Sequence, residues 1–174
     1  LYWLARMGVT VDHTDYRRYR IQPGSEFAPM DYTVPRDWSA ALYPIAAGVL
    51  TADSEVRVSG MDFDDCQGDK TVVDILRSMG ADIEIAGDTV IAKSSSLTGR
   101  EIDCNGCIDQ LPLLAVIGAA ATGETVLTNA AICRQKECDR IAATCETLRA
   151  MGADIEERPD GLVVRQSTLH GADL

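Results

Sequence analysis

The sequence of 174 residues has only 2 histidines, and its 16 basic residues are outnumbered by 27 acidic ones. It also lacks any apolar run of about 18 residues, so no helix is expected to span a membrane. With a formal net charge of −11 and no basic patch, no nucleic-acid partner is expected either. An acidic chain can still bind an anionic ligand if it gathers a few cations in one place.

Cysteine is present without an obvious structural role. The six cysteines are Cys66, Cys104, Cys107, Cys133, Cys138 and Cys145, and no secretory signal stands at the start of the chain. We interpret them as reduced thiols of a cytoplasmic protein, several of them in the core. Cys104 and Cys107 have the C-x-x-C spacing of zinc and redox sites, but no second pair follows, so no metal and no cofactor is expected. A metal or redox module is the alternative.

A repeat with a period of 72 residues organises the chain. The motifs LARMG, LRSMG and LRAMG end at Gly8, Gly80 and Gly152, and SSLTG (95–99) precedes STLHG (167–171) by the same spacing. Several matches in one ungapped register indicate duplicated units. The chain opens in the middle of a helical pattern, so we expect it to be a fragment of a longer protein.

Hydrophobic periodicity and turn residues predict an α+β fold of repeated βαβαββ units, two complete and one partial. The expected parts are a helix end and hairpin from a preceding repeat (1–24), a first complete unit (25–96), a second complete unit (97–168) and the start of a further unit (169–174). The first unit should open with a strand at DYTV (31–34). Turns are expected at Gly87-Asp88 and at Pro159-Asp160-Gly161.

The four predicted helices differ in how apolar their surfaces are. Those that are apolar nearly all round should be buried, at 37–49 and 109–121. Those with a single apolar stripe should be more exposed, at 68–79 and 137–151.

A cluster of charges stands at the start of the last predicted helix. Lys136 and Arg140 are four residues apart, so they are expected on one helix face, with Glu137 between them. The helix dipole favours anions at that end, so two cations there should lower stability unless an anionic ligand binds. A solvated helix start is the alternative. Asp109 and Asp37 each open an apolar helix, which is typical of an N-cap.

The chain resembles the EPSP synthases, the 3-phosphoshikimate 1-carboxyvinyltransferases. Their K-E-[ST]-D-R motif appears as KECDR (136–140), their D-E-x-P-type segment as IDQLP with Asp109, and their V-x-G-D-x-S-S-A segment as VPRDWSAALY around Asp37. The related UDP-N-acetylglucosamine enolpyruvyl transferases match these segments less well. The resemblance implies a two-lobed enzyme with its active site between the lobes, of which this chain would supply two units of one lobe and the last edge of the other.

The resemblance also implies a reaction and roles. The enzyme moves the enolpyruvyl group of phosphoenolpyruvate to the 5-hydroxyl of shikimate 3-phosphate, in chorismate and aromatic amino acid biosynthesis. Asp109 would act as the proton acceptor and Glu137 would exchange protons with the phosphoenolpyruvate methylene. Lys136 would bind shikimate 3-phosphate and Arg140 would bind phosphoenolpyruvate. No metal or redox cofactor is required.

Two departures from the family pattern concern the segment at the crossover between lobes. Arg36 replaces the usual glycine and Ala40 the second serine. Asp37 and Ser39 are expected to belong to the hinge or to support the substrate-binding residues from behind. Without the missing lobe, the fragment is expected to be inactive alone. The alternatives are a UDP-N-acetylglucosamine enolpyruvyl transferase and a non-catalytic βαβαββ binding module.

Overall fold

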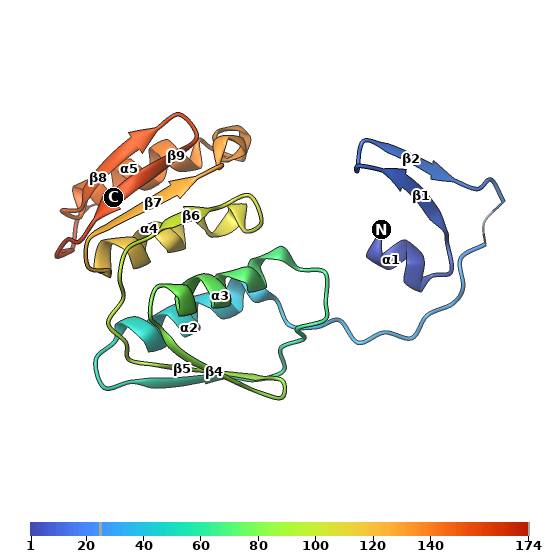
Figure 1. Ribbon diagram of the computed structural model, residues 1–174, viewed down its shortest axis with the longest axis horizontal. Helices are drawn as coiled ribbons and strands as arrows, with labels where there is room; N and C mark the ends of the chain where they lie inside the picture. The colour runs from blue at the N-terminus through green and yellow to red at the C-terminus, as the bar shows by residue number, and fades with distance from the viewer. Residues whose placement is uncertain (25, 174) are drawn as a thin grey trace. The chain divides into compact units, whose positions relative to one another are not determined.

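The computed structural model describes residues 1–24 and 26–173, which form two units, Leu1–Val34 and Pro35–Leu174. Ser25, in the predicted segment 25–96, and Leu174, in the segment 169–174, lie outside the described residues. The smaller unit contains a short helix, α1 (Tyr2–Arg6), and an antiparallel hairpin of β1 (Val11–Thr14) and β2 (Arg18–Ile21), as Figure 1 shows. The helix end and hairpin predicted here are therefore both present.

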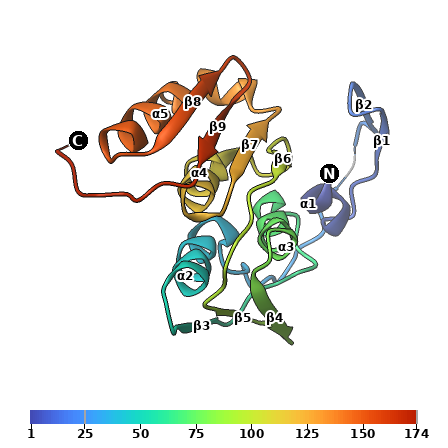
Figure 2. The same ribbon diagram turned by 60° about the vertical axis from the view of Figure 1, so that its left-hand side comes forward.

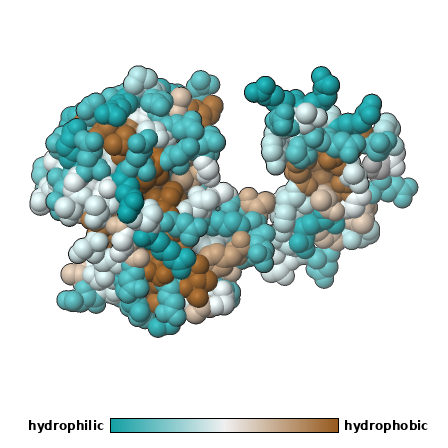
Figure 3. All heavy atoms as spheres, in the orientation of Figure 1, coloured by the Kyte–Doolittle hydropathy of each residue, from teal (hydrophilic) through white to brown (hydrophobic). Residues whose placement is uncertain are grey.

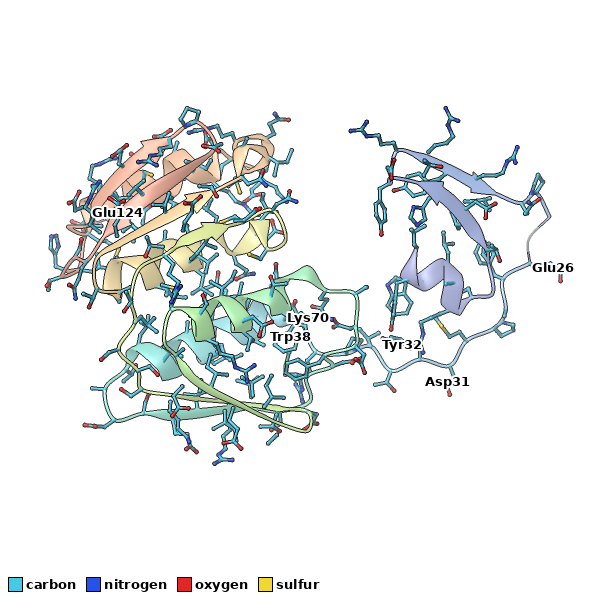
Figure 4. The ribbon with its side chains drawn as sticks, in the orientation of Figure 1. Glu26, Asp31, Tyr32, Trp38, Lys70 and Glu124 are labelled. Carbon is cyan, nitrogen blue, oxygen red and sulfur yellow. The ribbon has the colours of Figure 1, made fainter. Side chains whose placement is uncertain are left out.

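The strand predicted at 31–34 is absent. Residues 26–37 have no regular secondary structure, and Pro29 and Pro35, which lack a backbone N–H, flank the predicted strand. Tyr32 packs its ring edge-on against Trp3 at 4.6 Å, under the guanidinium of Arg6 at 4.6 Å. Tyr32 is labelled in Figure 4 beside α1. The segment thus contributes to the smaller unit and does not begin a βαβαββ unit.

The larger unit contains two successive groups of elements. The first comprises α2 (Trp38–Leu50), β3 (Glu55–Val58), η1 (Gly68–Lys70), α3 (Thr71–Ser78), β4 (Asp82–Ala86) and β5 (Thr89–Lys93). The second comprises β6 (Glu101–Asp103), η2 (Ile108–Gln110), α4 (Leu111–Ala120), β7 (Glu124–Thr128), η3 (Ala131–Gln135), α5 (Arg140–Ala150), β8 (Asp154–Arg158) and β9 (Gly161–Arg165). The second group has the predicted order βαβαββ. The first has the same order without its opening strand.

Each group builds its own sheet. The strand order is β3-β5-β4 in the first sheet and β6-β7-β9-β8 in the second, where β6 and β7 are parallel and the other pairs antiparallel. The hairpin turns fall at Gly87-Asp88 and at Pro159-Asp160, as predicted. No helix of the described residues is long and apolar enough to cross a membrane.

The core lies between the two sheets. Helices α2 and α4 pack against each other, and each also packs against its own sheet, as Figures 1 and 2 show. Seven of the ten residues of α4 are buried, and seven of the thirteen of α2, so both helices are buried as predicted. Helices α3 and α5 bury only one face. Figure 3 shows apolar side chains interrupting the polar surface of the larger unit.

The repeated glycines end their helices in the same way. Gly8, Gly80 and Gly152 have φ of 80°, 107° and 92°. In each copy the glycine N–H bonds to the carbonyl three residues back, and the next N–H bonds to the carbonyl of the motif's leucine. This is the Schellman motif, which favours glycine because of its positive φ.

The hydrogen bonds that follow these helices also recur at the 72-residue spacing. The N–H of Asp82 donates to Ser95 Oγ at 2.8 Å, and that of Asp154 donates to Ser167 Oγ at 2.9 Å. The N–H of Thr98 donates to the Met79 carbonyl at 2.8 Å, and that of His170 donates to the Met151 carbonyl at 2.9 Å. The sequence repeat therefore has a counterpart in the backbone of α3-β4-β5 and α5-β8-β9.

Candidate active site

Asp109 does not cap a helix. It lies in η2, and α4 begins after Gln110 with no side-chain cap. Its Oδ1 forms ion pairs with Lys136 Nζ and Arg140 Nη1, both at 2.9 Å, and Arg140 Nη1 also donates a hydrogen bond to it. Asp37, at the matching position of the repeat, caps α2 by accepting from the N–H groups of Ser39 at 3.1 Å and Ala40 at 3.2 Å. The N-cap interpretation is thus confirmed for Asp37 and wrong for Asp109.

Lys136 and Arg140 do not share a helix face. Helix α5 begins at Arg140, and Lys136 has an extended backbone with φ −79° and ψ −158°. The N-cap is Asp139, whose carboxylate accepts from the Ala142 N–H at 3.0 Å and therefore stabilises the helix start. The two cations converge because both reach across to Asp109.

Arg134 holds the segment before α5 in place. Its guanidinium contacts Asp139 at 2.7 Å and Glu157 at 2.9 Å, and it donates to the carbonyls of Arg158 and Pro159 at 2.6 and 2.9 Å. These contacts connect η3, the start of α5 and the β8–β9 turn. Because Lys136 and Glu137 lie between two anchored points, the loop that carries them is restrained at both ends.

The charges of the cluster are balanced within the chain. Arg140 donates to both carboxylate oxygens of Glu137, from Nε at 2.8 Å and from Nη2 at 2.9 Å, in addition to Asp109. Two cations thus face two carboxylates. The expected loss of stability without a bound anion is offset within the chain, because Asp109 and Glu137 provide negative charge.

These pairs are accessible to exchange. The Asp109 side chain is 49% exposed and that of Glu137 is 65% exposed, and ion pairs in contact with water contribute only about 0–1 kcal/mol each. An incoming phosphate or carboxylate can therefore replace a carboxylate partner of Arg140 at small cost.

Arg140 also controls the acidity of Glu137. Its hydrogen bonds to the Glu137 carboxylate lower the pKa of Glu137, and Glu137 in turn raises the pKa of Arg140. While paired, Glu137 is therefore a poor proton donor near neutral pH.

A cavity of about 620 Å³ opens beside Asp109. Its lining comes from α2, η2, α4 and α5, which can be followed in Figures 1 and 2. The lining residues are Ser39, Tyr43, Asp109, Gln110, Pro112, Val116, Glu137, Cys138, Arg140, Ala143, Thr144, Thr147 and Leu148. Four of the residues predicted for the site line the cavity: Ser39, Asp109, Glu137 and Arg140. Lys136 does not line it but is paired with Asp109, which does. Asp37 does not line it.

A hydrogen-bonded group of Ser39, Asp69 and Gln110 lies beside this cavity and was not predicted from the sequence. Ser39 Oγ donates to Asp69 Oδ2, and Gln110 Nε2 donates to the same oxygen at 2.8 Å. Gln110 follows Asp109 directly in IDQLP, and this position beside a predicted site residue is the feature of the sequence that could have indicated it. Asp69 follows Gln67-Gly68 with no cue of its own. Near this group Trp38 packs on Phe63 at 4.9 Å and Lys70 donates to the Phe63 carbonyl at 2.7 Å; Figure 4 labels both Trp38 and Lys70.

All six cysteines are free thiols. Burial raises the pKa of Cys104 to about 12 and also raises the pKa of Cys107, Cys133 and Cys145. Cys66 and Cys138 are exposed. Within residues 1–24 and 26–173, no group of three or more metal-ligating side chains is arranged to hold an ion.

The fold occurs in known enolpyruvyl transferases. The solved structure of EPSP synthase from Acinetobacter baumannii superposes with a TM-score of 0.76 and 29% identity, over 94% of this chain and 39% of that one. The enolpyruvyl transferase NikO from Streptomyces tendae superposes with a TM-score of 0.73 and 25% identity, over 97% of this chain and 40% of that one.

The amino-acid sequence shows to which family of enolpyruvyl transferases the chain belongs. Residues 1–174 match the family EPSP synthase (3-phosphoshikimate 1-carboxyvinyltransferase), and the chain belongs to that family. A 3-phosphoshikimate 1-carboxyvinyltransferase of Ruminiclostridium cellulolyticum is 42% identical over 99% of this chain, and one of Methanocaldococcus jannaschii is 40% identical over 98%. The chain spans 40% of the length of each of these two relatives.

Proposed function

We propose that the chain is part of a 3-phosphoshikimate 1-carboxyvinyltransferase and carries one wall of its active site. The observation that supports this most is the Asp109 carboxylate oxygen shared by Lys136 and Arg140 at 2.9 Å beside a cavity. These residues come from the two motifs that resemble the family. The substrates would be phosphoenolpyruvate and shikimate 3-phosphate.

The reaction needs a base, an acid and cations. The 5-hydroxyl of shikimate 3-phosphate adds to C2 of phosphoenolpyruvate while C3 takes a proton, and the tetrahedral adduct then loses phosphate together with a proton from C3, which restores the C2–C3 double bond. Asp109 would accept the hydroxyl proton, and Glu137 would deliver the proton to C3 in the addition and take one back in the elimination. Lys136 would bind the phosphate of shikimate 3-phosphate, and Arg140 would bind phosphoenolpyruvate.

The pairing of Arg140 links these roles. Phosphoenolpyruvate that binds Arg140 would replace Glu137 as its partner, which removes the contact that lowers the pKa of Glu137. Glu137 would then become protonated more readily, at the moment when a proton donor is needed. Asp37 and Ser39 would support the wall from α2, one as a helix cap and the other through Asp69.

The finer organisation belongs to the same proposal. We place two repeats at 25–96 and 97–168, the first without its opening strand and the second a complete βαβαββ unit, with 1–24 from a preceding repeat of the other lobe and 169–174 opening a further one. The recurrence of hydrogen bonds at the 72-residue spacing supports this division. The free thiols fit a cytoplasmic protein.

The test uses the full-length protein that contains this chain. Phosphate release should require both phosphoenolpyruvate and shikimate 3-phosphate, and the product should carry the carboxyvinyl group on the 5-oxygen. The fold also occurs in another enolpyruvyl transferase, NikO, so the acceptor has to be tested and not assumed. UDP-N-acetylglucosamine, the acceptor of the alternative function, is assayed in parallel. Turnover with UDP-N-acetylglucosamine and none with shikimate 3-phosphate would refute the proposed substrate.

A further inference from the structure

Two buried side-chain oxygens of the described residues have no hydrogen-bond partner, Gln110 Oε1 and Thr125 Oγ1. Gln110 is 2% exposed and Thr125 is fully buried. Leaving a buried acceptor unpaired costs about 1–3 kcal/mol, so each of them needs an explanation. Thr125 lies on β7 against Gly118 and does not line the cavity, whereas Gln110 lines the cavity next to Asp109.

The amide nitrogen of Gln110 makes a contact that an apolar side chain could not. It donates to Asp69 Oδ2 at 2.8 Å, the oxygen that also accepts from Ser39 Oγ. One carboxylate oxygen thus joins α2, η1 and η2 on the cavity wall. The backbones are also close there, since a Cβ added to Gly68 would lie 2.5 Å from the Gly106 carbonyl oxygen. This leaves η2 little room to shift toward η1.

Asp109 depends on this attachment. Among the described residues its carboxylate is paired with Lys136 and Arg140 alone, and both come from beyond η2. A bound anionic substrate would draw these cations toward itself. The position of the Asp109 carboxylate would then be set by the backbone of η2. Gln110 connects η2 to Asp69 by a side-chain hydrogen bond, and Ile108 packs against the core.

We infer that Gln110 is a positioning residue, which holds Asp109 in place through Asp69 and Ser39 when substrate engages Lys136 and Arg140. The assignment of Asp109 as the base rests on the proposed function; the attachment of η2 does not. The side chain at position 110 has to donate a hydrogen bond to Asp69. A methionine there would leave Asp69 Oδ2 with Ser39 as its one remaining donor, and η2 would be held less firmly. The amide that supplies this donor also carries an oxygen, Oε1, which is left without a partner.

The test compares Gln110→Met with Thr125→Val in the full-length protein. Each variant removes one buried unpaired oxygen with little change in volume, so neither should lower the melting temperature by more than a few degrees. Thr125→Val should keep kcat and KM within about twofold. Gln110→Met should lower kcat by about 10-fold to 100-fold with little change in KM, because the base is misplaced after substrate has bound.

A second readout does not need activity. Hydrogen exchange of the backbone amides of 108–111 should be faster in Gln110→Met and unchanged in Thr125→Val. Ser39→Ala combined with Gln110→Met should change kcat by less than the product of the two single effects, since both act through Asp69. Unchanged exchange at η2, or faster exchange with a normal kcat, would overturn the inference. An inactive parent protein would refute the proposed function alone, and the exchange data would still decide whether Gln110 holds η2.

Discussion

At the scale of single residues, Asp37 and Asp109 show how the same residue at the same place in a repeat takes two roles. Asp37 accepts hydrogen bonds from two backbone N–H groups, whereas Asp109 forms ion pairs with two cationic side chains. The difference comes from partners supplied by another segment, since Arg140 lies 31 positions beyond Asp109. Capping is a local property, and side-chain pairing across the cavity is not.

This contrast predicts opposite effects of two alanine substitutions. Asp37→Ala removes a helix cap and should lower the free energy of unfolding by about 1 kcal/mol. Asp109→Ala removes no cap and should change unfolding much less, but it should lower kcat of the full-length protein by about 100-fold to 10,000-fold. Thermal denaturation and steady-state kinetics measure the two effects. A large loss of stability with normal turnover in Asp109→Ala would make Asp109 structural.

The cysteines give a second prediction at this scale. Cys66 and Cys138 are exposed, whereas burial raises the pKa of the other four thiols. Because the thiolate is the nucleophile, iodoacetamide should label two cysteines quickly at pH 7.5 and the other four only after unfolding. Mass spectrometry of the labelled peptides identifies them.

Cys138 lines the cavity and Cys66 does not, so the pair also reports on binding. In the full-length protein, phosphoenolpyruvate with shikimate 3-phosphate should slow the labelling of Cys138, with Cys66 as the internal control. Equal protection of both thiols would indicate a general change of the fold, and protection of neither would place the substrates elsewhere.

At the scale of elements, the glycines that end α3 and α5 are the most repetitive feature. Gly80 has φ 107°, and a Cβ there would lie 3.2 Å from the Ser96 carbonyl oxygen; Gly152 has φ 92°, and its Cβ would meet the ring of His170. Alanine has difficulty adopting such a φ, at a cost of about 1–2 kcal/mol. Gly80→Ala and Gly152→Ala should each destabilise the chain by that amount.

Chemical denaturation of the chain measures this effect. Gly87→Ala serves as the matched control, because Gly87 also has a positive φ, of 62°, but its Cβ would meet nothing within 4 Å. Gly87→Ala should therefore measure the free-energy cost of a positive φ in alanine without the cost of a close contact at the Cβ. If Gly80→Ala were no worse than Gly87→Ala, the close approach to Ser96 would carry no energetic weight.

The elements that the sequence predicted well are those whose signals are local. Helices α2 and α4 and the turn at Gly87-Asp88 follow from apolar composition and turn residues. The strand at 31–34 failed because β-propensity does not guarantee a partner, and Tyr32 packs on Trp3 instead. The start of α5 was placed too early, since Arg134 and Asp139 hold the segment before it in a non-helical form.

Within the site, the sequence identified the charged residues but not their pairing. Ion pairs between Asp109 and Arg140, and the common oxygen of Asp69 that Ser39 and Gln110 share, depend on contacts between elements far apart in the chain. No periodicity or motif encodes such contacts. The ion pair follows from the packing of α4 against α5, and the shared oxygen of Asp69 follows from the contact between η1 and η2.

At the scale of the whole molecule, the charges beside the cavity set a limit on what the chain can do alone. Arg140 is the only cation among the described residues that line the cavity, and Lys136 reaches it through Asp109. Both are paired with carboxylates. Phosphoenolpyruvate and shikimate 3-phosphate together bring two phosphates and two carboxylates, so most of their charge would have no partner on this wall.

The 174-residue chain should therefore bind these substrates weakly and release no phosphate from them. Two cations already paired with Asp109 and Glu137 supply little net attraction, and effective catalysis requires both substrates to be held in one orientation. Isothermal titration should give a Kd of about 1 mM or weaker for either substrate, and binding should weaken further with salt. The full-length protein under the same conditions is the positive control. Clear phosphate release by the chain alone would show that the catalytic groups all lie within these 174 residues, and that the cavity beside Asp109 is not one wall of a larger site.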